Sequence, residues 1–479
     1  MLKHNHLFID GAMTIAQGED ELPVTDSFTE EVFARYRSAS REDVQEAVAA
    51  ARRAFTGWSN TPLNERIAAV RGVAAALSVH SEVLASAISR EVGMPCKLSA
   101  RIQVGAPIAA WESYAELAAD VDWETRVGHS LVQKVPVGVV ACITPWNYPL
   151  HQITGKIVPA LLAGCTVVLK PSEIAPTSAF MLAEAIHKAG LPPGVFNLVH
   201  GSGPDVGETL ISHPDVDMIS FTGSTHAGRH IASVAGRDIK RLALELGGKS
   251  AALVLPGADL SLAVKATMAS CMLNSGQTCS SMTRLLVQRS MLHEVEQLAK
   301  ELLAGYRMGD PADAGTRLGP LVSKMQQQKV QAMIEAALAQ GAQTIESYQP
   351  VPDRGFFVPA TVLSEVSPDM TIANEEVFGP VLSIICYDDV ENGIELANGT
   401  EYGLAGAVWG PPDEATLSVA RRIRAGQVDI NGAPFNPAAP FGGFKKSGIG
   451  RENGKDGIEE FLETVAIQLP AKFFELSSL

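Results

Sequence analysis

One cysteine in this sequence has a setting that suits chemistry better than packing. Cys279 lies in the heptapeptide Asn274–Ser280, among small polar residues, where a core cysteine would have apolar neighbours. A thiolate is a strong nucleophile, but an unperturbed thiol, with a pKa of about 8.5, is mostly protonated at neutral pH and needs activation. The competing interpretation is a structural thiol, because free cysteine is among the most buried residue types.

Two further polar side chains could assist such a nucleophile. Glu245 lies in Leu242–Lys249, just before a pair of glycines, and alternation places it opposite the leucines beside it. A carboxylate at the end of a buried strand would have a raised pKa, as a general base requires; alternatively, it faces water on an edge strand. Asn147 lies in Thr144–Pro149, where two prolines fix the loop. Its amide could be held rigidly as a donor to an oxyanion, or it is simply a turn residue.

Two other segments have residues that could bind a nucleotide, and a third is noted for its composition alone. Phe221–Thr225 lies at a strand-to-helix turn, where glycine and a helix N-terminus favour pyrophosphate, although its hydroxyl groups could equally cap the helix. Lys170–Glu173 ends a strand, and its lysine and glutamate could bind ribose hydroxyls or form a solvated ion pair. A carboxylate here would repel a 2′-phosphate, which favours NAD over NADP. Glu375–Pro380 is an acidic-aromatic turn or an ordinary loop.

The standard dinucleotide fingerprint is absent. Gly201 and Gly203 begin a glycine pattern, but the next glycine is Gly207, one position too late for G-x-G-x-x-G. This motif therefore does not predict an ordinary Rossmann domain.

The elements that must position these residues alternate between strand and helix. Val137–Thr144 is almost continuously apolar, as expected of a strand that is buried on both faces. Such alternation indicates a parallel, doubly wound sheet, which binds nucleotides at the carboxyl ends of its strands, where the candidate residues fall. Further strands are expected at Thr166–Lys170, Val195–Val199, Met218–Phe221 and Arg241–Leu246, and helices at Thr177–Ala189, after Gly201–Gly207 and at Thr225–Ala235.

Two further regions, one on each side of these elements, make up most of the remaining chain. The first hundred or so residues are mainly helical, after short strands with a turn at Asp10-Gly11. A second α/β region begins beyond Gly248 and contains the cysteine heptapeptide between a helix and a strand. The remaining expected elements are helices from Ser40 (with a capping box), after Pro62, at His80–Val92, Ser99–Ala119 and Leu260–Leu273, strands at Ser130–Val135 and Thr283–Val287, and a strand with a loose end in Glu460–Leu479.

Composition excludes several classes of protein. The 479 residues are 46% hydrophobic and 19% charged, which is typical of a globular chain of two or three domains. The net charge of −15 and the lack of a basic stripe argue against nucleic acid or an anionic membrane as partners. The six cysteines include no Cys-x-x-Cys pair and none near a histidine, so we expect no metal site and a reducing compartment. The N-terminus has no apolar signal core, so the cytoplasm is expected.

Seven motifs together resemble the aldehyde dehydrogenase superfamily. They are Thr144–Pro149, Lys170–Glu173, Phe221–Thr225, Leu244–Lys249, Gly276–Ser280, Glu375–Pro380 and Pro440–Gly443, in the family's order and spacing. The resemblance implies an α/β fold with an atypical Rossmann cofactor domain, a second α/β catalytic domain and a small β oligomerisation element. It places the cofactor domain at 1–117 and 137–246, the catalytic domain at 247–446, and the oligomerisation or bridging element at 118–136 and 447–479. A homodimer or homotetramer follows from the same resemblance.

The resemblance also implies a reaction, the oxidation of an aldehyde to the carboxylic acid with NAD, or possible NADP, as the cofactor. Cys279 matches the nucleophile that forms a thiohemiacetal and then a thioester, Asn147 the oxyanion donor, and Glu245 the base that activates water. Relatives that acylate CoA lack this glutamate, so hydrolysis is expected. The cofactor-binding matches are Thr144, Trp146, Lys170, Glu173, Gly203, Gly207, Phe221, Gly223, Ser224, Leu246, Gly247, Glu376 and Phe378.

The substrate is less well defined than the reaction. Gly155 departs from the bulky aromatic residue of several relatives, which implies a wider tunnel and a medium or bulky, uncharged aldehyde. No acidic cage for a trimethylammonium group is evident, which disfavours betaine aldehyde. Alternatives are a CoA-acylating dehydrogenase, a thiol-dependent esterase, or a binding protein that keeps the fold without turnover. The substrate-tunnel matches are Tyr148, Gln152, Gly155, Leu273, Thr278, Ser280, Phe435 and Phe441.

Overall fold

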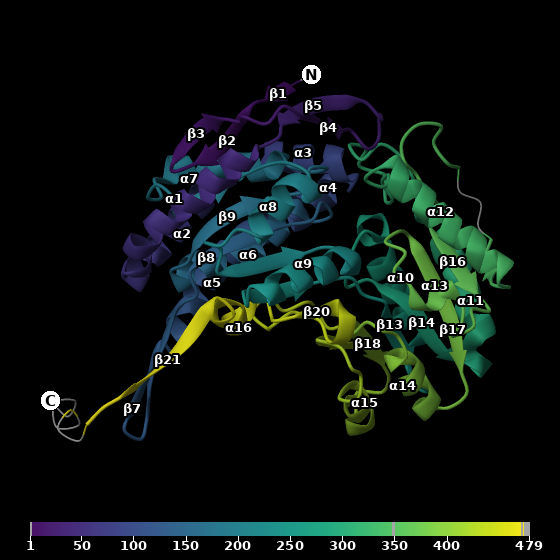
Figure 1. Ribbon diagram of the computed structural model, residues 1–479. Helices are drawn as coiled ribbons and strands as arrows, with labels where there is room; N and C mark the ends of the chain where they lie inside the picture. Colours follow the sequence, from purple (N-terminus) through teal and green to yellow (C-terminus); the bar gives the residue numbers. More distant parts are fainter. Residues whose placement is uncertain (1, 347–349, 471–472, 474–479) are drawn as a thin grey trace.

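The computed structural model describes residues 2–346, 350–470 and 473, which form two large sheets and two small ones (Figure 1). The part of the predicted tail Glu460–Leu479 beyond residue 470, except residue 473, lies outside the described residues. The first large sheet has eight strands and the second has seven. Each is covered by helices on both faces, as the alternating strands and helices of the sequence predict.

The eight-stranded sheet has a parallel centre in the order β12-β11-β8-β9-β10. The chain runs outward from β8 to β10, returns beyond β8 and continues with β11 and β12. The strand order therefore reverses between β8 and β11, which is where such sheets bind ligands. The central strands are β8 (Val139–Ile143), β9 (Thr166–Lys170), β10 (Phe196–Leu198), β11 (Met218–Thr222) and β12 (Arg241–Glu245).

Three antiparallel strands complete this sheet. The hairpin of β2 (His6–Ile9) and β3 (Ala12–Ile15) extends one edge, and its turn has positive φ at Asp10 and Gly11, as predicted. β20 (Gly448–Ile449) covers β12 at the other edge. Residues 448–449, assigned from the sequence to the bridging element, thus pair with the large sheet, and the division into domains stays a prediction.

Burial explains the apolar sequence of the central strands. Along β8, Val140 and Cys142 join one hydrophobic core, whereas Val139, Ala141 and Ile143 join the core on the other face. The helices that cover the faces are α1 (Arg41–Ser59), α2 (Leu63–Ser78), α3 (Ser81–Val92), α4 (Cys96–Leu98), α5 (Ala106–Leu117), α6 (Pro149–Ala163), α7 (Thr177–Ala189), α8 (Glu208–Ile211) and α9 (Thr225–Arg237).

Two of the helix predictions can be compared in detail. The capping box is confirmed, because Ser40 and Asp43 exchange side-chain to backbone hydrogen bonds at the start of α1. The helical segment predicted at Ser99–Ala119 is confirmed, but it is not α-helical throughout. The structure has a π-helix at Ser99–Gly105, then α5, then a 3₁₀ turn, because Pro107 lacks the N–H for an α-helical bond.

The second large sheet carries the cysteine heptapeptide. Its order is β15-β16-β17-β14-β13-β18-β19, with β15 antiparallel and the others parallel. The strands are β13 (Ser250–Val254), β14 (Met282–Gln288), β15 (Gln343–Thr344), β16 (Thr361–Ser364), β17 (Val381–Tyr387), β18 (Ala405–Trp409) and β19 (Gln427–Ile430). The helices are α10 (Leu260–Met272), α11 (Leu292–Leu303), α12 (Lys324–Ala339), α13 (Thr371–Asn374), α14 (Val390–Asn398) and α15 (Glu414–Ala420).

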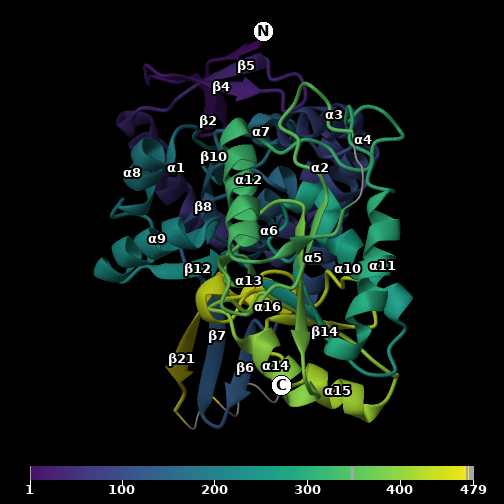
Figure 2. The ribbon, with the colours of Figure 1, turned by 90° about the vertical axis from the view of Figure 1, so that its right-hand side faces the viewer.

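The two small sheets lie at the ends of the molecule. One joins β1 (Leu2–His4), β5 (Val32–Arg37) and β4 (Glu21–Thr25) near the N-terminus. The other joins β6 (Glu124–Val127), β7 (Ser130–Pro136) and β21 (Leu462–Gln468), which follows α16 (Gly454–Glu459), and it extends away from the body (Figure 2). No single described helix is long and apolar enough to cross a membrane; the bent pair α2 and α3 passes only by length and composition.

Candidate active site

The loop that carries Cys279 is held in a strained conformation by buried hydrogen bonds. Three consecutive residues, Asn274, Ser275 and Gly276, have positive φ values of 52°, 54° and 75°. At Gly276 only glycine fits, because a Cβ would lie 2.0 Å from the carbonyl oxygen of Gly379. Strain of this kind persists only where the surroundings determine the backbone. The structure thus fixes the position of the thiol.

Hydrogen bonds to distant segments hold the backbone of this loop in its conformation. Ser275 Oγ donates to the carbonyl of Gly319 at 2.7 Å. Gln277 is fully buried; its amide nitrogen donates to the carbonyl of Val92, and its amide oxygen accepts from the N–H of Val322 at 2.8 Å. The loop is therefore tied to both halves of the molecule.

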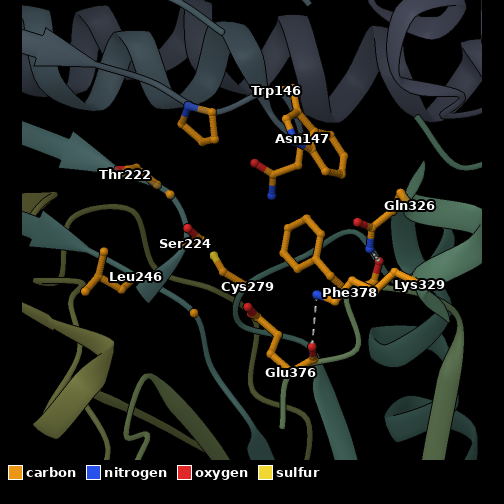
Figure 3. A pocket seen from close by; sticks show the side chains of 13 residues that line it. Trp146, Asn147, Thr222, Ser224, Leu246, Cys279, Gln326, Lys329, Glu376 and Phe378 are labelled. Carbon is orange, nitrogen blue, oxygen red and sulfur yellow. Dashed lines mark hydrogen bonds between the residues drawn. The ribbon is translucent and has the colours of Figure 1, made fainter. Parts of the chain in front are cut away.

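Asn147 follows β8 and lies beside this loop, as Figure 3 shows. Its Nδ2 donates to the carbonyl of Gln277 at 3.0 Å. Its own carbonyl accepts from the amide groups of Gln103 and Asn274, at 2.9 and 3.0 Å. An amide nitrogen has two hydrogens, so one remains for a group in the cavity that both Asn147 and Cys279 line. The side chain is fixed in place with one donor to spare.

Glu245 ends β12 and is buried, with 5% of its surface exposed. The edge-strand alternative is excluded, because β20 covers this position through Gly448. Among the described residues, neither carboxylate oxygen has a hydrogen-bond partner. Burial raises the pKa of Glu245 well above its usual value, Glu452 raises it further, and Lys156 partly opposes the shift. Lys156 is itself 1% exposed and donates to Glu452 at 2.6 Å.

The thiol of Cys279 interacts electrostatically with three carboxylates, those of Glu245, Glu452 and Glu376. Burial raises the pKa of Cys279 to about 12, with further contributions first from Glu376 and then from Glu245. The thiol is therefore protonated at neutral pH in the free protein, and its activation is required, as the sequence analysis expects.

A cavity of about 180 Å³ is lined by residues from both large sheets and their loops, and the Cys279 thiol is part of its lining (Figure 3). The side chains of Cys279, Asn147 and Phe378 point toward one another there. Phe378 has a φ of 60° and makes an edge-to-face contact with Trp146, with 5.4 Å between the ring centroids. The lining residues are Pro145, Trp146, Asn147, Thr222, Gly223, Ser224, Leu246, Gly247, Cys279, Gln326, Lys329, Glu376 and Phe378.

The cavity wall combines a helix N-terminus with an acidic side chain. Ser224 caps α9, so the capping alternative holds, and the helix still directs its N-terminus at the cavity. Glu376 accepts a hydrogen bond from the N–H of Gly248 at 3.0 Å, and burial raises its pKa. Gly247 must lack a side chain, because a Cβ would lie 2.4 Å from Glu376 Oε2.

These features fit a dinucleotide. The buried hydroxyl of Thr222 has no partner among the described residues. A helix N-terminus suits pyrophosphate, and a carboxylate beside a glycine pair suits ribose hydroxyls. The cavity lies where the strand order of the first sheet reverses. Seven of the predicted cofactor residues line it: Trp146, Gly223, Ser224, Leu246, Gly247, Glu376 and Phe378.

The other predicted cofactor residues lie outside the cavity lining. Lys170 is 3% exposed and donates to the carbonyl of Pro171 and, at 3.5 Å, to the half-exposed Glu173. It is therefore not the fully solvated pair that the alternative supposed. Gly207 packs along the Lys170 side chain, whereas Gly203 faces open space. The N–H of Thr144 donates to the Lys170 carbonyl, and the Phe221 ring packs beside Gly223.

The predicted substrate residues fall into two groups. Tyr148 and Thr278 share a hydrogen bond of 2.6 Å, Thr278 also donates to the carbonyl of Leu273, and the backbone of Ser280 lowers the pKa of the Cys279 thiol, against the effect of burial. Gly155 and Phe435 line a second cavity, of about 460 Å³, and Phe435 contacts the Phe441 ring. Gln152 is buried on α6.

Several lining residues had no signal in the sequence. Gln326 and Lys329 come from α12, and the sequence gives nothing to single out either of them. Pro145 and Thr222 lie inside motifs already recognised and could have been included on position alone. Within the described ranges, no three His, Cys, Asp or Glu side chains gather in a way that could hold a metal ion.

Comparison with known proteins agrees with this geometry. A model described as the aldehyde dehydrogenase family matches residues 14–467. A 3-succinoylsemialdehyde-pyridine dehydrogenase from Pseudomonas sp is 45% identical over 471 residues, which cover 98% of this chain and 99% of that protein.

Solved structures of aldehyde dehydrogenases are also similar to this chain. A mutant of aldehyde dehydrogenase C from Pseudomonas syringae, in complex with NAD+ and octanal, is 45% identical with a TM-score of 0.95, covering 97% of this chain and 96% of that one. An aldehyde dehydrogenase from Mycobacterium tuberculosis in complex with NAD+ is 38% identical, also with a TM-score of 0.95, covering 98% of this chain and 99% of that one.

Proposed function

The chain belongs to the aldehyde dehydrogenase family, and we propose that Cys279 is its nucleophile, Glu245 its general base and Asn147 its oxyanion donor. The reaction is the NAD-dependent oxidation of an aldehyde to the carboxylic acid. One observation carries the assignment of roles. The thiol and the Asn147 amide line one cavity, and the charge of the buried Glu245 carboxylate raises the pKa of the same thiol.

In the first step, the Cys279 thiol gives up its proton to solvent, and its sulfur attacks the aldehyde carbon to give a thiohemiacetal oxyanion. The spare N–H of Asn147 and the N–H of Cys279 stabilise this oxyanion, and each such donor contributes roughly 3 kcal/mol. Bound between the α9 N-terminus and Glu376, NAD would supply the acceptor for the hydride that leaves the former aldehyde carbon. Cys279 then holds the acyl group as a thioester.

The second step is hydrolysis of that thioester. Glu245 takes a proton from water, which attacks the acyl carbon and releases the acid and the thiol. The raised pKa of Glu245 suits this role, because a base with a pKa near the working pH transfers protons efficiently. Lys156 and Glu452 lie behind Glu245 and set part of that pKa through their charges.

For the cofactor, the proposal assigns the pyrophosphate to the α9 N-terminus at Gly223 and Ser224, and the nicotinamide ribose to Glu376. Lys170 and Glu173 are proposed to bind the adenosine ribose, where the Glu173 carboxylate disfavours NADP. Thr144, Gly203, Gly207 and Phe221 are proposed to shape the same side of the site.

Absorbance of the reduced nicotinamide, followed with a panel of aldehydes, tests the function. We expect turnover with NAD, slower turnover with NADP, and no requirement for CoA. If the reaction required CoA, the role proposed for Glu245 would be wrong. Hydrolysis of esters without nicotinamide would instead support a thiol-dependent esterase. Cys279→Ala should abolish oxidation while NAD still binds, which would exclude a binding protein without turnover.

Assembly and location are further parts of the proposal. The sheet of β6, β7 and β21 extends from the body and exposes Val127, Val465 and Ile467, which supports a homodimer or homotetramer built through it. Light scattering after size-exclusion chromatography distinguishes the two.

All six cysteines are free, which agrees with the proposed cytoplasmic location. The domains are proposed as 1–117 with 137–246, 247–446, and 118–136 with 447–479.

A further inference from the structure

The second cavity, of about 460 Å³, is lined mainly by apolar side chains. Its size lies within the range that encloses drug-sized ligands. The wall from α5 presents small side chains, Ala106, Ala109 and Ala110, and the wall from α6 presents Gly155. A Cβ at Gly155 would lie 3.3 Å from Glu452 Oε2, so any larger residue would press on that carboxylate. Small residues at these positions create the room.

Contacts connect this cavity to the reacting centre. The His151 ring lines the cavity and lies 6.4 Å from the Tyr148 ring, whose hydroxyl is bonded to Thr278, the neighbour of Cys279. Glu452 borders Gly155 on another side, and its charge acts on Cys279. Tyr148 with Thr278, and separately Glu452, thus connect the lining of this cavity to the residues around the thiol.

The polar groups of this lining are few, and most are already bonded. The hydroxyl of Tyr114 bonds to Asn453, and the hydroxyl of Thr154 accepts from the indole of Trp111. His151 makes no hydrogen bond with any residue that the structure describes, and burial lowers its pKa. A neutral imidazole offers one donor and one acceptor to a ligand. None of the lining residues is a lysine or arginine.

We propose that this cavity receives the tail of a bulky, uncharged aldehyde, and that His151 determines specificity by hydrogen-bonding a polar atom in that tail. The inference rests on the proposed function and adds the residue that selects among such aldehydes. A carboxylate on the tail is rejected, because the cavity offers no cation to pair with it and Glu452 lies beside it. A tail that is apolar throughout fits by volume but leaves the imidazole without a partner.

Two isosteric aldehydes test the role of His151. In 3-cyclohexylpropanal and 3-(tetrahydropyran-4-yl)propanal, one ring CH₂ is exchanged for oxygen and the shape is kept. We expect kcat/KM to favour the oxygen compound roughly three- to tenfold, the effect of one hydrogen bond. His151→Leu should bring this ratio close to one, and His151→Gln, which keeps a donor, should restore part of it. His293→Leu, an exposed histidine on α11, is the matched control and should keep the full ratio.

Two more substrates separate the possible failures. Hexanal should be favoured over 6-oxohexanoate at least tenfold, because only the second carries a carboxylate. A ratio of the ring compounds that His151→Leu leaves unchanged, or a preference for 6-oxohexanoate, would overturn the inference. Propanal is too short to use the cavity. If folded protein that binds NAD fails to oxidise propanal as well, the proposed function itself fails.

Discussion

The two sides of the Cys279 thiol differ in how their polar groups are satisfied. On the amide side, Asn147 and Gln277 are buried and hydrogen-bonded to backbone groups from distant segments. On the acid side, the Glu245 carboxylate has no partner among the described residues, and Glu376 accepts a single backbone N–H at 3.0 Å. The polar side chains on the amide side are therefore well hydrogen-bonded, whereas the carboxylates on the acid side have few hydrogen-bond partners or none.

The physical chemistry of the two tasks explains this difference. An oxyanion donor must be in place before charge develops, so its side chain has to be rigid, and the hydrogen bonds of Asn147 to the Cys279 loop hold it while one N–H stays free. A general base must instead accept a proton near neutral pH. Donors to its carboxylate would lower the pKa, whereas burial without partners raises it, as at Glu245. Geometry is controlled on one side and charge on the other.

The largest expected effect comes from removing the charge on the acid side. Glu245→Gln keeps the shape but cannot accept the proton of water, so the thioester should accumulate. We expect steady-state turnover to fall roughly 10²- to 10⁴-fold while a burst of about one reduced cofactor per active site remains. Stopped-flow absorbance measures both. Glu463→Gln, a half-exposed carboxylate on β21, is the control. Loss of the burst would show that Glu245 acts before the thioester forms.

Changing the amide side should give a different kinetic pattern. Asn147→Ala removes an oxyanion donor, so formation of the thioester becomes slow. We expect kcat/KM to fall about 10²- to 10³-fold with no burst. Asn64→Ala, on the exposed face of α2, is the matched control. If Asn147→Ala keeps a full burst, the comparison between the two sides breaks down.

The sequence predicted the elements of the fold well, for identifiable reasons. Continuous apolar strands such as Val137–Thr144 and caps such as Ser40 depend on local properties, and both are found in the structure. The sequence also placed Cys279, Asn147 and Glu245 at the ends of elements, where the structure brings them near one pocket. Asn147 and Glu245 lie close together because β8 and β12 are parallel strands that end at one edge of the first sheet, whereas Cys279 comes from the loop before β14 in the second sheet.

Residues that meet the site through long-range packing could not be predicted. Lys329 enters the cavity from α12, and Glu452 reaches Glu245 from the far end of the chain. Neither lies in a segment whose local pattern differs from an ordinary surface. The burial of Glu245 was likewise undetermined, because it depends on β20, a two-residue strand with no recognisable pattern.

A smaller effect concerns stability and its dependence on pH. The pKa of Glu245 is higher in the folded protein than in the unfolded chain, where it is about 4.3. Its contribution to stability is therefore complete below that value and is lost as the pH rises through the folded pKa. Glu245→Gln cannot ionise and keeps this stability. We expect its Tm to match the wild type at pH 4 and to exceed it by about 1–3 °C at pH 9. Scanning calorimetry at several pH values measures the difference, which should stay constant for Glu463→Gln.

The smallest effect concerns the charge of Glu376 on the thiol. After burial, Glu376 is the largest contribution that raises the pKa of Cys279. Glu376→Gln removes the charge, and its amide oxygen can still accept from Gly248. The fraction of thiolate should increase, so we expect iodoacetamide to alkylate Cys279 roughly three- to tenfold faster at pH 8 without cofactor. Mass spectrometry of the Cys279 peptide measures the rate apart from the other thiols. Glu375→Gln, the exposed neighbour, should leave it unchanged. Equal rates in all three proteins would mean that burial alone holds the thiol neutral, and the acid side would then control only the second step.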